Sequence, residues 1–125
     1  MCLNARGASC GIWFVVGLIA LLHVYILVLE MFFWDKPAGL RAFGQSQAAA
    51  SASKVLAANQ GLYNGFLGAG LLWGLSLGPA GRHIVIFFLA CVVVAGVFGA
   101  LTASRKILWV QAVPGAIALL LVLFS

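Results

Sequence analysis

Four apolar runs of about 20 residues each dominate the sequence, and charge, glycine or proline separates each run from the next. About 20 helical residues cross a hydrocarbon core of about 30 Å. Lipid offers no partner for backbone N–H and C=O groups, so a chain segment inside it has to be helical. The pattern therefore predicts an all-α integral membrane protein, an antiparallel bundle of four transmembrane helices over residues 11–33, 55–77, 84–103 and 107–124.

Composition and connection lengths agree with this class. Of the 125 residues, 65% are hydrophobic and 7% are charged, and the mean hydropathy is +1.18. A soluble domain carries about 25% charged residues. The short connections 78–83 and 104–106 predict antiparallel neighbours within a single domain, residues 1–125. The longer connection 34–54 is either a flexible loop or a short surface helix with Leu40 and Phe43 facing lipid.

The net charge of +5 comes from seven Lys and Arg residues against Glu30 and Asp35. The basic residues stand singly at the edges of the apolar runs, which is typical of topology signals and not of a nucleic-acid-binding patch. One side of the membrane would hold Lys36, Arg41, Lys54, Arg105 and Lys106, and the other Arg6 and Arg82. The positive-inside rule then places the first side in the cytoplasm and predicts both termini outside the cytoplasm.

No recognisable cofactor or metal motif is present. Cys2, Cys10 and Cys91 form no CxxC or Cys/His spacing, so the sequence predicts neither a disulfide framework nor a metal site. Phosphate-binding loops and Ser/His/Asp sets are also absent from the sequence. We therefore expect no bound cofactor.

Polar residues inside the apolar runs are the informative exceptions. His23 and Glu30 are seven residues apart, which places them on one helix face about 10.5 Å apart along the axis. The second run carries two i, i+4 pairs that form one polar stripe, and the fourth run carries an amide near its cytoplasmic end: Asn59 with Tyr63, Gln60 with Asn64, and Gln111.

These polar residues share a depth, from the predicted midplane to the cytoplasmic end. We therefore expect a polar pocket open to the cytoplasm and lined by His23, Glu30, Asn59, Gln60, Tyr63, Asn64 and Gln111. An ionisable residue inside a membrane is costly and is a functional candidate. The alternative is a structural network, since amides also join helices in membranes, and Glu30 has Lys54 at a similar depth as a potential ion-pair partner.

Glycines mark helix faces that allow close packing. Gly61, Gly65 and Gly68 lie on a different face from the polar stripe, and Gly96 and Gly99 recur in the third run. A bundle of four helices is too narrow to enclose a wide transport pathway by itself, so we expect a homo-oligomer that uses these glycine faces. Pro114 leaves a backbone carbonyl near Val110 without its helical partner, which predicts a kink there.

Several long motifs resemble one family. They are Lys54-Val-Leu-Ala-Ala-Asn-Gln-Gly-Leu-Tyr-Asn-Gly-Phe-Leu, His23-Val-Tyr-Ile-Leu-Val-Leu-Glu-Met-Phe, Val94-Ala-Gly-Val-Phe-Gly-Ala-Leu-Thr, and Ser104-Arg-Lys-Ile-Leu with Gln111 and Pro114 after it. From about Gly17 onward the chain resembles DUF1304, a family of small bacterial multi-pass membrane proteins of unknown function. The resemblance implies an inner-membrane protein of about this length, and it implies no catalytic residues.

Three functional readings follow from the sequence. The first is proton-coupled binding or transport of a small apolar or amphipathic molecule, with Glu30 and His23 as proton carriers. The second is a membrane enzyme that uses one of these two residues as acid or base on a lipid-soluble substrate. The third is a structural or accessory subunit, in which the polar network only holds the helices together. The lipid bilayer is a partner in all three.

Overall fold

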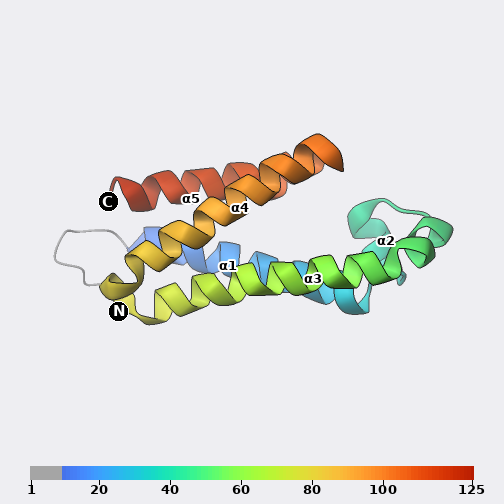
Figure 1. Ribbon diagram of the computed structural model, residues 1–125, viewed down its shortest axis with the longest axis horizontal. Coiled ribbons are helices and arrows are strands. Elements are labelled where there is room, and N and C mark those ends of the chain that lie inside the picture. Colours follow the sequence, from blue (N-terminus) through green and yellow to red (C-terminus); the bar gives the residue numbers. More distant parts are fainter. Residues whose placement is uncertain (1–9) are drawn as a thin grey trace. The chain divides into compact units, whose positions relative to one another are not determined.

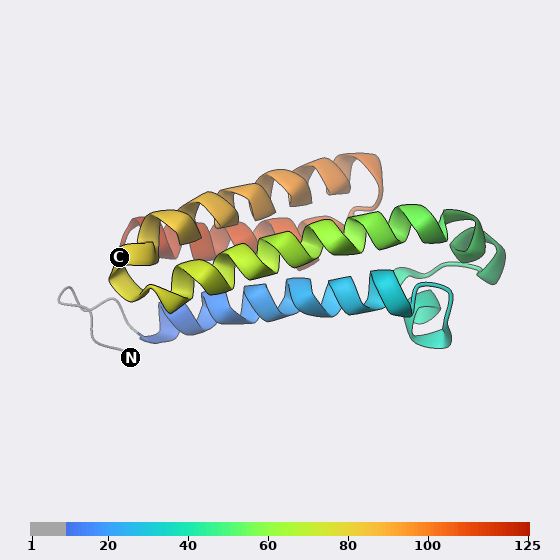
Figure 2. The same cartoon turned by 60° about the horizontal axis from the view of Figure 1, so that its bottom comes forward.

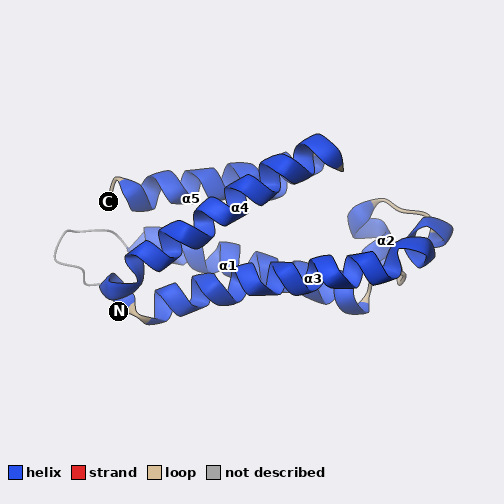
Figure 3. Ribbon diagram, in the orientation of Figure 1, coloured by secondary structure: helices blue, strands red, loops and turns tan. Residues whose placement is uncertain are grey.

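The computed structural model describes residues 10–125, and every regular element in this range is a helix (Figures 1 and 3). In order, the elements are α1 (Cys10–Phe32), α2 (Pro37–Phe43), α3 (Gln47–Ser76), the 3₁₀ helix η1 (Gly78–Gly81), α4 (Arg82–Thr102), the π-helical segment η2 (Leu108–Ala112) and α5 (Val113–Leu123). The all-α prediction is confirmed, and each apolar run is helical.

The connection predicted over residues 34–54 is shorter than expected. It contains the short helix α2, while the orientation of Leu40 and Phe43 toward lipid stays a prediction, and α3 already begins at Gln47. The hydroxyl of Ser46 accepts a hydrogen bond from the backbone N–H of Ala49 at 3.2 Å, which caps this start. The run of Ala and Ser after Gln47 extends the helix because alanine is the strongest helix former.

Two helical segments are long and apolar enough to cross a membrane by length and composition, Cys10–Phe32 and Gly78–Thr102. A third apolar segment, Leu108–Leu123, is shorter. Helix α3 has 30 residues, but the amides Asn59, Gln60 and Asn64 interrupt its apolar character. Two of the four predicted spans therefore meet this criterion.

The described chain divides into two compact units, which we treat separately. The first unit is Leu21–Gly68, in which the end of α1 and the start of α3 lie side by side and antiparallel (Figure 2). Gly61 makes the close approach possible, because a Cβ there would lie 2.7 Å from Met31 Cγ and 3.2 Å from the carbonyl oxygen of Leu27. Gly61 of α3 is thus packed against α1 within this unit.

Helix α2 turns back against the end of α1 in this first unit. The backbone of Gly39 lies so close to the carbonyl group of Phe33 that no side chain fits between them. The rings of Trp34 and Phe43 pack in a tilted arrangement with centroids 4.8 Å apart, and the indole N–H of Trp34 donates to the Ser53 hydroxyl at 3.1 Å. These contacts tie α1, α2 and α3 together at one end.

The second unit contains residues 10–20 together with Ala69–Ser125. Within it α4 and α5 are antiparallel neighbours (Figure 2). A Cβ on Gly96 would lie 2.7 Å from the backbone nitrogen of Ala112, so the two helix backbones nearly touch. At the other end, the guanidinium of Arg82 donates to the carbonyl of Val122 at 2.8 Å and so satisfies the C-terminus of α5.

The predicted irregularity before Pro114 takes the form of the π-helical segment η2. A π turn widens the helix and absorbs the backbone position that proline leaves without a donor.

The cysteines differ from the prediction that the chain has no disulfide framework. Cys10 is disulfide-bonded, while Cys91 is a free thiol.

Candidate functional site

A carboxylate–amide pair joins two helices in the unit Leu21–Gly68. The side-chain nitrogen of Asn64 donates to Glu30 Oε1 at 2.6 Å and to the backbone carbonyl of Gln60 at 3.1 Å. Both N–H groups of the amide are therefore used, and the second one fixes Asn64 against its own helix. Glu30 itself is only 9% exposed.

Local packing explains why these two side chains meet. Glu30 lies two residues before the end of α1 at Phe32, and a Cβ on Gly61 would lie 3.0 Å from its Cβ. The missing side chain at Gly61 lets the helices approach closely. Asn64 follows three residues later, so it projects from α3 beside the same contact and reaches the carboxylate.

Glu30 has no cationic partner among residues 10–125. The ammonium of Lys54 instead pairs with Asp35 at 3.2 Å, so the suggested ion pair between Glu30 and Lys54 is wrong. The hydrogen bond from Asn64 is the one side-chain interaction of Glu30 in the described part of the chain, and it engages Oε1. No side chain of the described residues is hydrogen-bonded to the second carboxylate oxygen.

Asp35 lies just beyond α1 and has different surroundings. Its pKa is held below the ordinary value of 3.8, chiefly because Lys54 donates a hydrogen bond to it. Asp35 thus carries its charge next to a cation, whereas Glu30 sits beside a neutral amide. The two acidic residues of this chain are therefore chemically distinct.

The other predicted pocket residues are more scattered. His23 is fully buried, on the same helix as Glu30, whereas the side chains of Asn59, Gln60 and Tyr63 are exposed on α3. Gln111 belongs to the second unit, where its side-chain N–H donates to the carbonyl of Val92 at 3.4 Å. The structure directly joins Glu30 with Asn64, and one pocket formed by all seven residues stays a prediction.

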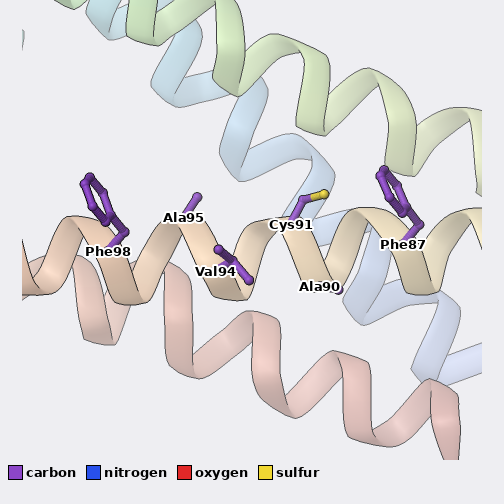
Figure 4. Close-up of a pocket in the computed structure, with 6 residues that line it drawn as sticks. All are labelled: Phe87, Ala90, Cys91, Val94, Ala95 and Phe98. Atoms are coloured by element: carbon purple, nitrogen blue, oxygen red, sulfur yellow. The ribbon is translucent and has the colours of Figure 1, made fainter.

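An apolar hollow on α4 was not foreseen from the sequence. Figure 4 shows side chains from successive turns of this one helix along it, namely Phe87, Ala90, Cys91, Val94, Ala95 and Phe98. The 3–4 spacing of these residues was the available signal. Within residues 10–125, no three His, Cys, Asp or Glu side chains lie close enough together to hold a metal ion.

Comparison with known proteins places this sequence in a family. The sequence profile described as "Protein of unknown function (DUF1304)" matches residues 17–123. The chain belongs to the DUF1304 family. This confirms the resemblance seen in the sequence motifs, and the matched range includes both Glu30 and Asn64.

A relative of similar length is the "Uncharacterized protein YpaA" of Lactococcus lactis subsp. lactis (strain IL1403). It is 33% identical over 110 residues, which cover 86% of the present chain and 90% of the relative. No solved structure matches the chain. The family assignment thus comes without a known activity.

Proposed function

We propose that this DUF1304 protein crosses the inner membrane four times and binds a small amphipathic molecule at Glu30 in a step linked to proton exchange. The observation that carries the proposal is the Glu30–Asn64 contact. An acid lies two residues from the end of an apolar helix, one of its oxygens accepts a hydrogen bond from an amide, and it has no cation beside it in the described residues.

The exposed surface supports a membrane environment. Large apolar side chains are exposed on both of the long apolar helices, including Phe14 at 66% and Leu21 at 59% on α1, and Phe98 at 67% and Leu101 at 81% on α4. Soluble monomers rarely expose contiguous apolar surface of this extent. Lipid solvates such side chains directly, so these helices fit a bilayer without any further partner.

The other two proposed spans, α3 and Leu108–Leu123, are argued from the lengths of their helices. Helix α3, with 30 residues, is about 45 Å long, which exceeds a hydrocarbon core of about 30 Å. Its Ala/Ser-rich start would therefore project into the cytoplasm. The segment Leu108–Leu123 is short for a span, and the basic residues Arg105 and Lys106 before it would mark the membrane surface.

The basic residues define the orientation of the proposed spans. The cytoplasmic side would hold Lys36, Arg41, Lys54, Arg105 and Lys106, with Arg82 on the opposite side. Both termini would then lie outside the cytoplasm. In this orientation Glu30 and Asn64 lie in the cytoplasmic half of the membrane, within reach of a molecule that enters from that side.

The chemistry of the site follows from the cost of charge in a membrane. A carboxylate in hydrocarbon is expensive unless a cation or a proton accompanies it. Glu30 can release its proton to water when the ammonium group of an amphipathic ligand takes the place of the proton, so the carboxylate stays neutralised. The amide of Asn64 holds Oε1 during the exchange, which leaves the second oxygen to bind the incoming group.

Native mass spectrometry of the protein in nanodiscs tests this proposal. The comparison is between the wild type, Glu30→Gln, which keeps the shape but removes the charge, and Asp35→Asn as the control acid. We expect a small molecule bound to the wild type and to Asp35→Asn, but lost in Glu30→Gln. Absence of any bound species from all three, with Glu30→Gln only less stable, would favour a structural role for the pair.

A further inference from the structure

We infer that the segment between α1 and α3 is a cap that controls access to Glu30 from the cytoplasm, and that the ion pair of Asp35 with Lys54 is its latch. The inference rests on the ligand site and the orientation proposed above, but its test needs no bound ligand. We call residues 33–46, which include α2, the α2 cap.

The burial of Glu30 requires that some part of the chain moves before a molecule from the cytoplasm reaches it. The residue is only 9% exposed. The neighbouring contact of α1 with α3 is costly to open, because Gly61 brings the two helices close together and a Cβ there would lie 3.2 Å from the carbonyl oxygen of Leu27. A more loosely held element on the cytoplasmic side is therefore the better candidate for this movement.

Three side-chain contacts fasten the start of the α2 cap to α3. Lys54 Nζ lies 3.2 Å from Asp35 Oδ2, and the indole N–H of Trp34 donates to the Ser53 hydroxyl at 3.1 Å. The side-chain nitrogen of Gln47 donates to the backbone carbonyl of Asp35 at 3.1 Å. All three contacts are polar, and water can replace each of them when the cap moves away.

The latch lies on the same face of α3 as the contact beside Glu30. Lys54, Ala57 and Gly61 are three and four positions apart, so they follow one face of the helix. Along the axis, Lys54 is about 10.5 Å from Gly61, and Ala57, which is 5% exposed, lies between them. The α2 cap lies at this end of the α1–α3 pair (Figure 2). A molecule that follows this face from the cytoplasm therefore meets the ion pair before it meets Glu30.

Helix α2 belongs to the cap because it packs on the cap's own first residues. Gly39 lies against the carbonyl group of Phe33, and the ring of Phe43 lies 4.8 Å from the ring of Trp34. At its other end α2 stops at Gly44, whose left-handed backbone with φ of 63° turns the chain toward α3. These contacts stay intact when the ties to α3 open, so the cap can move as one piece.

Cysteine accessibility in inside-out membrane vesicles tests the latch. The three native cysteines are first replaced by serine. Ala57→Cys then supplies a reporter between the latch and Glu30, and Ser46→Cys supplies an exposed control reporter next to α3. The rate of reaction with a charged, membrane-impermeant methanethiosulfonate is measured for each reporter.

The latch is opened by Lys54→Gln, for which the chain offers a matched control. Lys36→Gln makes the same change of charge within the cap, at an exposed lysine that forms no ion pair within residues 10–125. We expect Lys54→Gln to speed the reaction of Ala57→Cys about 1.5- to 5-fold, the change in open population that loss of one exposed ion pair allows. Lys36→Gln should leave this rate unchanged, and Ser46→Cys should react equally in all backgrounds.

Exchange of the two charges separates the latch from a general loss of structure. Asp35→Lys combined with Lys54→Asp rebuilds the ion pair and should restore the slow reaction of Ala57→Cys. Equal rates with and without Lys54, acceleration by both lysine substitutions, or acceleration that the exchanged pair does not reverse would overturn the latch. Reaction of Ser46→Cys in right-side-out vesicles alone would overturn the cytoplasmic position of the cap.

Ser53→Ala tests the second tie without any change of charge. The substitution removes the hydroxyl that accepts the hydrogen bond from Trp34, so it should also speed the reaction of Ala57→Cys. An unchanged rate would contradict the fastening of the cap through Trp34. No ligand takes part in these measurements, so failure of the cap and failure of ligand binding at Glu30 are distinguishable.

Discussion

Asn64 donates a 2.6 Å hydrogen bond to Glu30 and thereby links the end of α1 to the middle of α3. The contact depends on Gly61, which removes the side chain that would otherwise separate the two helices. A buried acid is thus held by a neutral partner through one oxygen. This arrangement distinguishes Glu30 from Asp35, which pairs with a lysine.

Removal of the Asn64 amide should destabilise the fold. In Asn64→Ala the buried carboxyl group loses its donor, which costs about 1–3 kcal/mol in the free energy of unfolding. Gln60→Ala is the control, because that side chain is exposed on the same helix. The measurement is denaturation in mild detergent. If Asn64→Ala and Gln60→Ala unfold alike, the hydrogen bond does not contribute as described.

The backbone contact between α4 and η2 predicts a strong difference between two glycines. Gly96→Ala places a Cβ 2.7 Å from the backbone nitrogen of Ala112, so the helices must separate, at a cost of about 1–3 kcal/mol. At Gly17 the nearest atom is Leu75 Cδ1 at 3.9 Å, so alanine fits and gains up to about 1 kcal/mol of helix propensity. The thermal unfolding temperature should fall for Gly96→Ala and rise for Gly17→Ala. An unchanged unfolding temperature in Gly96→Ala would refute the close packing.

The ion pair between Asp35 and Lys54 predicts a specific pH dependence. The pKa of Asp35 is lowered in the folded chain by the hydrogen bond from Lys54, with Lys36 contributing a weaker attraction. The pair therefore stabilises the fold above the ordinary value of 3.8, and this stabilisation is lost as pH falls through the lowered pKa. Unfolding midpoints measured from about pH 6 to about pH 2 should fall more steeply for the wild type than for Asp35→Asn. Parallel curves would show that the pair has no effect.

The proposed orientation predicts which loops an impermeant maleimide reaches. Ser46→Cys lies between α2 and α3 and should be labelled only after the cells are opened. Ala80→Cys lies in η1 and should be labelled in intact cells with a permeable outer envelope. Labelling is compared in a background without native cysteines. The reverse pattern would invert the topology, and equal labelling of both positions would contradict the membrane span between them.

The apolar runs are sufficient to predict the helices, because length and hydropathy are properties of a single segment. The start of α3 was missed, since the Ala/Ser run 48–53 resembles a polar connection although alanine favours helix. The position of the break before Pro114 follows from the missing N–H of proline. Its form as a π turn depends on how α5 packs against α4 and is not encoded locally.

The candidate site shows that contacts between neighbouring helices cannot be predicted from one sequence. Periodicity shows which residues share a helix face, but it does not show which residue on the next helix lies opposite. For Glu30 the sequence suggested Lys54, while the structure gives Asn64, because Lys54 is closer to Asp35 beyond the end of α1. The exposed position of Asn59 likewise follows from the face that Gly61 turns toward α1.

The most direct test of the central claim is carbodiimide labelling of membranes, because it asks whether Glu30 is a reachable acid within the bilayer. Hydrophobic dicyclohexylcarbodiimide reacts with protonated carboxyl groups in apolar surroundings, and a water-soluble carbodiimide reports acids that contact water. Peptide mass spectrometry locates the adduct. We expect the hydrophobic reagent to modify Glu30, more at lower pH, and the water-soluble one to modify Asp35. An unmodified Glu30 would contradict the account and indicate a sealed structural contact, and its modification by the water-soluble reagent alone would contradict its place in the membrane.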